Sequence, residues 1–180
     1  MDPVVVVILR AALALLLAAA AVHKLRDAGA FRASVAAYAL LPDAAVGAFS
    51  RVLPALEVAI ALALLGPATG HAGALAAAAL LAVYALAIGI NLARGRRDLD
   101  CGCFGVSSRQ TIGGALLARN ALLIAAALAT LAPARVRPLA WLDYCTASLA
   151  LATLAALYAA ADRLLAHGPA LARLRAEGRA

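Results

Sequence analysis

Residues 4–22 read VVVVILRAALALLLAAAAV, and Arg10 is the only charged residue among these nineteen. A helix that crosses the hydrocarbon core of a bilayer needs about 17–25 predominantly apolar residues. Asp2 and Pro3 precede the segment, which is a favourable helix start, and polar residues 23–27 follow it. The stretch therefore predicts a membrane-spanning helix. A cleaved signal peptide is the alternative, but it needs a positive amino-terminal region and a shorter apolar core.

The whole chain has the composition that this first segment suggests. Of its 180 residues 66% are hydrophobic and 14% are charged, whereas soluble domains are about 45–50% apolar. A water-soluble globular protein is excluded. The apolar residues fall in blocks, so we predict one all-α, polytopic integral membrane domain over residues 1–180. Its spans are expected at about 4–22, 44–65, 72–94, 115–131 and 139–161, with an amphipathic interfacial helix over 28–41, a polar loop over 95–114 and a basic tail over 162–180.

The distribution of Lys and Arg predicts how the chain lies in the membrane. Eleven of them fall in the 23–43 segment, in the 95–114 loop together with Arg94 just before it, and in the tail, and two, Arg135 and Arg137, fall in the opposite loops. Cytoplasmic loops carry the excess of positive charge. We therefore expect a multi-pass protein of the plasma membrane, with its N-terminus outside and the 95–114 loop in the cytoplasm. The net charge of +7 belongs to these loops and does not indicate a nucleic-acid partner.

Charged residues inside the spans form a first group of candidate functional residues. Arg10 and Glu57 lie at similar predicted depths near one membrane face. An isolated charge in a span costs about 2.5–3.5 kcal/mol on insertion scales, so a pair is the least costly arrangement. We predict an Arg10–Glu57 ion pair, with either a structural role or a role in proton relay or ligand binding.

A second group lies near the opposite face, where the polar loop begins and ends. Its members are Arg51, Asn91, Arg94, Arg119 and Asn120. Cationic groups favour the thiolate form of a nearby cysteine, which is the reactive form. This group is expected to support thiol chemistry in the loop, although arginines near a helix end also reach the lipid headgroups.

The loop carries the motif Cys101-Gly102-Cys103. Cysteines at positions i and i+2 can form a strained disulfide, and strained, exposed disulfides are the labile and catalytic ones. A metal site needs three or four ligands, and the loop offers only Asp98 and Asp100 beside the thiols. A redox pair is therefore favoured over a metal site or two inert thiols. Cys145, near the opposite face, is expected to serve packing.

The residues Asp100-Cys101-Gly102-Cys103-Phe104-Gly105, preceded by 91–96 (NLARGR), resemble the signature of the MauE family, methylamine utilisation membrane proteins within the broader DoxX-like group. The resemblance covers about residues 5–131. Further matching positions are 24–27 (KLRD), Phe31, Ser34-Val35, Tyr38, Leu41-Pro42, Leu53-Pro54, Glu57 and Arg119-Asn120.

The resemblance implies a DoxX-like four-helix bundle, here with a fifth transmembrane helix. It also implies a role in maturing the disulfide-rich small subunit of methylamine dehydrogenase, beside a thioredoxin-like partner. We therefore expect a membrane thiol–disulfide oxidoreductase that acts through Cys101 and Cys103. Two alternatives stay open: a non-catalytic membrane chaperone or assembly factor, and a subunit that binds a quinone or another small molecule around Arg51, Glu57 and Arg119.

Overall fold

The computed structural model describes every residue except 97–98, 100–111, 134–136 and 178–180, and the side chains of 162 and 164–177 are likewise not described. The described chain is helical, as predicted, and contains no strand. The helices are α1 (Pro3–Arg26), α2 (Ala28–Ala37), α3 (Asp43–Leu65), α4 (Gly70–Ala93), α5 (Gly114–Ala129) and α6 (Trp141–Glu177).

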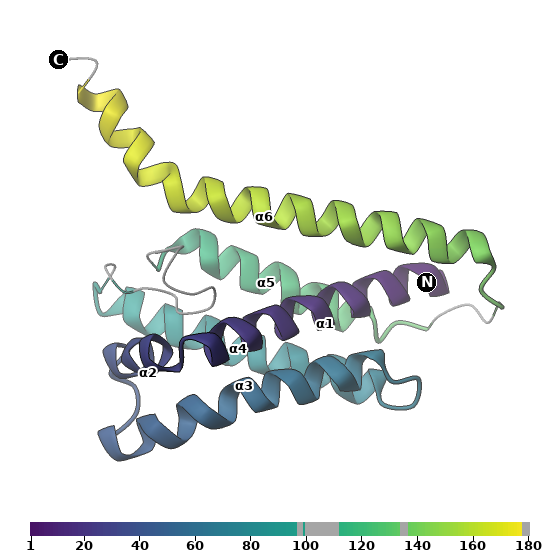
Figure 1. Ribbon diagram of the computed structural model, residues 1–180, viewed down its shortest axis with the longest axis horizontal. Coiled ribbons are helices and arrows are strands. Elements are labelled where there is room, and N and C mark those ends of the chain that lie inside the picture. Colours follow the sequence, from purple (N-terminus) through teal and green to yellow (C-terminus); the bar gives the residue numbers. More distant parts are fainter. Residues whose placement is uncertain (97–98, 100–111, 134–136, 178–180) are drawn as a thin grey trace.

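Helices α1, α3, α4 and α5 form a bundle in which successive helices run in opposite directions (Figure 1). The closest packing is between α1 and α3, between α4 and α5, and between α3 and α4. The short helix α2 covers one end of the bundle and packs on α3, while α6 lies along the outside against α1. The core consists of leucine, isoleucine and alanine side chains from α1, α3, α4 and α5, with Phe31 of α2 at its edge.

A glycine allows two helices of the bundle to approach closely. A Cβ atom at Gly73 would lie 2.6 Å from the backbone nitrogen of Leu64, so α3 and α4 are in backbone contact at this point. Small residues allow such approach in membranes, where dispersion contacts hold helices together. A Cβ atom at Gly89, on the same helix, would meet nothing within 4 Å. Of these two glycines, Gly73 is therefore the one that close helix packing requires.

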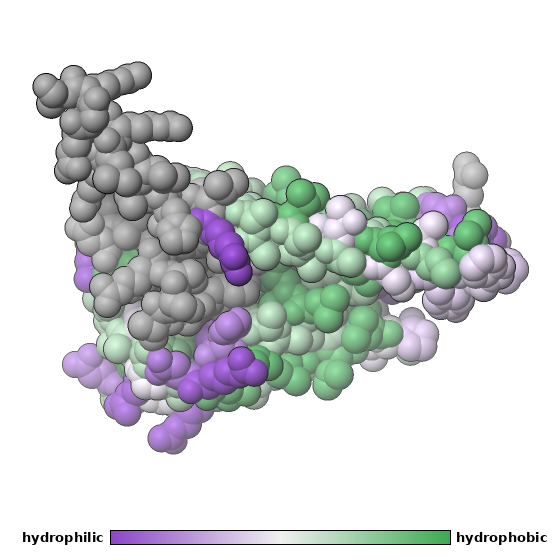
Figure 2. All heavy atoms as spheres, turned by 45° about the horizontal axis from the view of Figure 1, so that its top comes forward, coloured by the Kyte–Doolittle hydropathy of each residue, from purple (hydrophilic) through white to green (hydrophobic). Residues whose placement is uncertain are grey.

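The described helices have the length and apolarity of a membrane protein. Four of them, α1, α3, α4 and the first 21 residues of α6, are long and apolar enough to cross a bilayer, and α5 is apolar but has 16 residues. Hydrophobic side chains cover the middle of the face seen in Figure 2, and hydrophilic side chains gather toward its ends. The chain is a multi-pass helical membrane protein.

Three details differ from the expectations. Helix α2 ends at Ala37 instead of residue 41, because the chain turns at Ala39, which has a positive φ of 50°. Helix α6 does not end at residue 161 but continues to Glu177, since alanine, leucine and arginine dominate this segment and all favour helix. Cys145 is exposed on α6 and does not serve packing within the chain. Few residues of α6 are buried, because it lies along the outside of the bundle, mainly against α1 in the described part of the chain.

Candidate functional site

The most deeply buried charged residue of the described chain is Glu57, whose exposure is 0%. It lies on α3 and faces Lys24 of α1 and Tyr84 of α4. The Lys24 ammonium donates a hydrogen bond to Glu57 Oε1 and forms a buried ion pair with it. Tyr84 Oη donates to the same oxygen at 2.6 Å and accepts from Lys24 at 3.2 Å. Three helices thus meet in one polar cluster, which we call the Lys24–Glu57–Tyr84 cluster.

The predicted pair of Arg10 with Glu57 is wrong, because Lys24 occupies the position expected for Arg10. Side chains on a helix lean toward its N-terminus. Helices α1 and α3 are antiparallel (Figure 1). Lys24 and Glu57 therefore lean toward each other, whereas Arg10 leans toward the opposite end of the bundle. There its guanidinium approaches the carbonyl oxygen of Thr130 at 3.5 Å and lies against Gly70, where a Cβ atom would collide with it.

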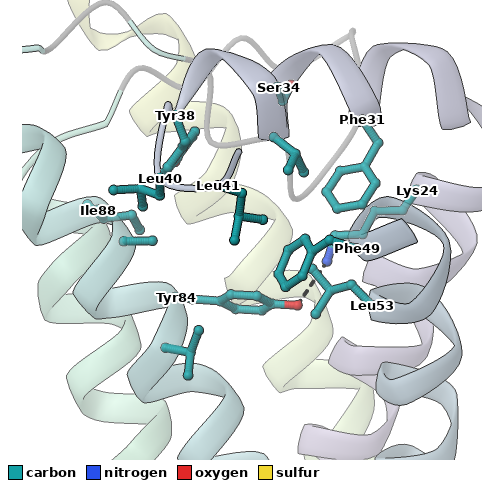
Figure 3. A pocket seen from close by; sticks show the side chains of 13 residues that line it. Lys24, Phe31, Ser34, Tyr38, Leu40, Leu41, Phe49, Leu53, Tyr84 and Ile88 are labelled. Carbon is teal, nitrogen blue, oxygen red and sulfur yellow. Dashed lines mark hydrogen bonds between the residues drawn. The ribbon is translucent and has the colours of Figure 1, made fainter. Parts of the chain in front are cut away.

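An apolar cavity of about 220 Å³ lies beside the cluster, under α2 (Figure 3). Lys24 and Tyr84 form its polar end, and their contact is the dashed line in the figure. The amphipathic segment predicted over 28–41 contributes Phe31, Val35 and Tyr38 to the lining of this space. The remaining walls come from α2, α3, α4 and the chain between α2 and α3, namely Ser34, Leu40, Leu41, Phe49, Leu53, Val83, Ala87 and Ile88.

The cluster places one positive and one negative charge in an apolar surrounding. The ammonium of Lys24 also lies 5.3 Å from the centroid of the Phe31 ring and 5.0 Å from that of Tyr84, within cation–π range. Removing charges from water is costly, and an unpaired buried charge costs more than a pair. The second carboxylate oxygen, Glu57 Oε2, is buried with no hydrogen-bond partner among the described residues. Lys24 is therefore the main compensation for the Glu57 charge.

A second structured region lies where the polar loop leaves the bundle. The two residues that flank the segment 100–111 are joined, because the N–H of Ile112 donates to the carbonyl oxygen of Leu99 at 3.0 Å. Ile112 is buried against Ile88 and Leu116. Arg96 fixes the same region, since it donates to the carbonyl oxygens of Ala37 (2.8 Å) and Tyr38 (3.4 Å) and to Asn91 Oδ1 (3.2 Å). Both ends of the loop are thus held on the bundle beside the end of α2.

The predicted cysteines Cys101 and Cys103 lie outside the described residues. Of the residues expected to support them, Asn91 is buried and bonds to Arg96 and to the carbonyl oxygen of Ala87. Arg94 donates to the carbonyl oxygen of Ala39 at 3.4 Å. These two therefore lie at the base of the loop.

The other three supporting residues have different surroundings. Arg119 donates to the Tyr158 hydroxyl of α6 at 3.0 Å and lies 5.8 Å from the centroid of its ring. Asn120 is buried and bonds to Leu116 in its own helix. Arg51 is exposed on α3. Among the described contacts none joins Arg119, Asn120 and Arg51 to one another.

Sequence reasoning missed the two partners of Glu57. The division of the sequence into apolar blocks puts Lys24 in a polar segment after the first span. Lys24 nevertheless lies on the same face of the helix as the buried residues Leu17, Ala20 and Ala21. Glu57 lies in register with Leu53, Ile60 and Leu64 in the same way. This register is the signal that could have paired them. It is weak in a membrane helix, because both faces are apolar and the buried stripe has little contrast.

The fold and the site together define a multi-pass membrane protein with a buried lysine–glutamate pair beside an apolar cavity. The family profile described as "Methylamine utilisation protein MauE" matches residues 2–133, and the chain belongs to this family, as the sequence motif predicted. It is 46% identical to methylamine utilization protein MauE of Paracoccus versutus and 41% identical to that of Paracoccus denitrificans, each over 91% of this chain and 88% of the relative. The protein of the same name from Methylorubrum extorquens is 41% identical over 70% of this chain and 68% of its own length. No solved structure matches the chain.

Proposed function

We propose that this chain is a membrane thiol–disulfide oxidoreductase that helps a client of the methylamine utilisation system to acquire its disulfides. Cys101 and Cys103 are the exchanging pair. A client dithiol attacks the Cys101–Cys103 disulfide, a mixed disulfide forms, and the second client thiol resolves it. The client gains one disulfide, and the protein keeps two thiols and the two electrons until a thioredoxin-like partner reoxidises it.

The observation that carries this proposal is the closure of the loop base. The Leu99–Ile112 hydrogen bond joins the flanks of the twelve residues that contain both cysteines. Arg94 and Arg96 lie at this base and bond to the carbonyl oxygens that end α2. Cations near a thiol lower its pKa and stabilise the reduced pair as thiolate, which makes the disulfide the stronger oxidant.

The proposal also includes the orientation given by the charge distribution, with the loop on the cytoplasmic side. Cys145 is exposed on α6 and would react with the same reagents, so the test uses a Cys145→Ser background. Reduced Cys101 and Cys103 should then resist an impermeant maleimide in intact cells and react once the membrane is opened. Labelling from outside would reverse the orientation.

The redox role is tested by titrating the pair against defined glutathione buffers, with alkylation and mass spectrometry as the readout. We expect a disulfide that is reduced more easily than a structural one. In the reoxidation step, one thiolate of the pair attacks the disulfide of the thioredoxin-like partner, and the other thiol resolves the mixed disulfide and leaves the partner as a dithiol. Cys101→Ser and Cys103→Ser should each trap this mixed disulfide, because the thiol of the pair that resolves it is gone. If the double Cys→Ser variant still supports client maturation, the protein acts as a non-catalytic assembly factor instead.

A further inference from the structure

We propose that the cavity beside Lys24 binds the ring of a membrane quinone, a neutral, flat molecule that carries carbonyl groups. The size of the cavity is the first reason. A cavity of about 150 Å³ holds benzene, so about 220 Å³ has room for one substituted six-membered ring. A long isoprenoid tail does not fit inside and would have to remain in the bilayer.

The charge balance of the site selects a neutral ligand. Lys24 and Glu57 compensate each other, one positive charge against one negative charge, both with almost no solvent exposure. A carboxylate or an amine brought into the same space would add an uncompensated buried charge, which is strongly unfavourable. A fatty acid headgroup is therefore a poor occupant, although its chain would suit the apolar walls.

The polar end of the cavity selects a hydrogen-bond acceptor. An ammonium group has three N–H donors, and the described partners of Lys24 are two, Glu57 Oε1 and Tyr84 Oη. Tyr84 Oη already donates to Glu57. The third N–H of Lys24 is the donor left at the wall of the cavity, and a carbonyl oxygen is its natural acceptor.

The walls select a flat ring that comes from the lipid. Figure 3 shows the rings of Phe31, Phe49 and Tyr84 around the polar end, with Tyr38 farther along the wall. Aromatic side chains gain from stacked and edge-to-face contact with a second ring. Val83 lines the cavity and is nevertheless 52% exposed. This wall of the cavity therefore lies at the outer surface of α4, and we infer that a lipid-soluble molecule enters there.

The probe for this site is tetramethyl-1,4-benzoquinone, whose ring has no free position for a thiol to attack. Binding is measured by calorimetric titration and ligand-observed NMR on the full chain in detergent. All three cysteines are replaced by serine, so that a failure of the redox proposal cannot affect the result. We expect saturable binding, with an affinity at least about tenfold higher than that of 1,2,4,5-tetramethylbenzene, which has the same ring without carbonyl groups. Absence of saturable binding, or equal affinity for the two probes, would overturn the proposal.

Two neighbouring substitutions on α4 locate the binding. Ala87→Phe fills the cavity, whereas Leu86→Phe adds a ring at a residue that is 64% exposed and does not line it. Ala87→Phe should weaken quinone binding by about tenfold or more, and Leu86→Phe should leave it within about twofold. An equal effect of both variants places the ligand elsewhere and overturns the proposal. If Ala87→Phe does not fold, the comparison of the two probes on the parent chain decides alone.

Discussion

The two ends of the bundle differ in the burial of their ion pairs and in how tightly their helices pack. At the α2 end, Lys24 and Glu57 are buried, and aromatic side chains surround a cavity. At the other end, Arg137 bonds on the surface to Asp2 and Asp143, and the backbones of α3 and α4 touch at Gly73. The α2 end therefore has a cavity beside a buried ion pair. The opposite end is tightly packed, and its ion pairs are exposed.

This difference determines which substitutions matter. A buried ion that loses its partner remains in an apolar surrounding, whereas an exposed ion is hydrated when its partner is removed. The effects should therefore fall from the buried pair, through the backbone contact and the loop base, to the exposed ions.

The largest effect is expected for Glu57→Leu. The substitution leaves Lys24 buried at 3% exposure without its counter-ion, and breaking a buried pair in this way costs about 3–5 kcal/mol. The folded fraction should fall accordingly in a denaturation series of the purified protein. Lys24→Met in the same chain should restore most of the loss, since it removes the uncompensated charge. If Arg10→Leu restored the lost stability instead, Arg10 would be the partner of Glu57, and this result would contradict the Lys24–Glu57–Tyr84 cluster.

The next effect concerns the packed end. Gly73→Ala places a Cβ 2.6 Å from the Leu64 nitrogen, and because backbone atoms cannot move aside locally, α3 and α4 must separate. Overpacking of this kind costs about 1–3 kcal/mol. Gly89→Ala on the same helix is the matched control, because its Cβ meets nothing within 4 Å. The same denaturation series should show a loss for the first and none for the second; equal behaviour would mean that helix propensity alone governs α4.

The sequence predicted the helical membrane fold and the family well, because both depend on features that are local in the chain. Apolar blocks are visible without any knowledge of packing, and the motif around Cys101 is continuous. The partner of Glu57 was not predictable in the same way. It depends on which direction side chains lean and on how far α1 continues past residue 22, since Lys24 belongs to the helix that ends at Arg26. The depth of a residue, when it is counted from the end of an apolar block, includes neither the direction of the side chain nor the true end of the helix.

The base of the loop should show a smaller effect, because its hydrogen bonds are partly exposed. Arg96→Met removes the donors to Ala37, Tyr38 and Asn91 while keeping an apolar side chain of similar length. Amide exchange at Ile112, whose N–H bonds to Leu99, should accelerate by up to about tenfold, the equivalent of about 1.4 kcal/mol. Arg26→Met is a suitable control, since Arg26 is exposed at the end of α1. Unchanged exchange in the Arg96 variant would show that apolar packing of Ile112 alone closes the loop base.

The smallest effect belongs to the exposed ions at the N-terminal end. The Val4 backbone N–H, and then the Arg137 guanidinium, hold the pKa of Asp2 below its ordinary value. A carboxyl group with a lowered pKa in the folded state contributes stability above its unfolded pKa of about 4, and this contribution is lost as the pH falls through the folded value. Asp2→Asn should therefore lower the melting temperature by only about 1 °C at pH 7, and the difference from the parent chain should disappear at an acid pH below the folded-state pKa of Asp2. Thermal unfolding of the two chains at both pH values measures this directly. A loss at pH 7 as large as that of Glu57→Leu would mean that the exposed ions hold the bundle together as strongly as the buried pair, and the contrast between the two ends would fail.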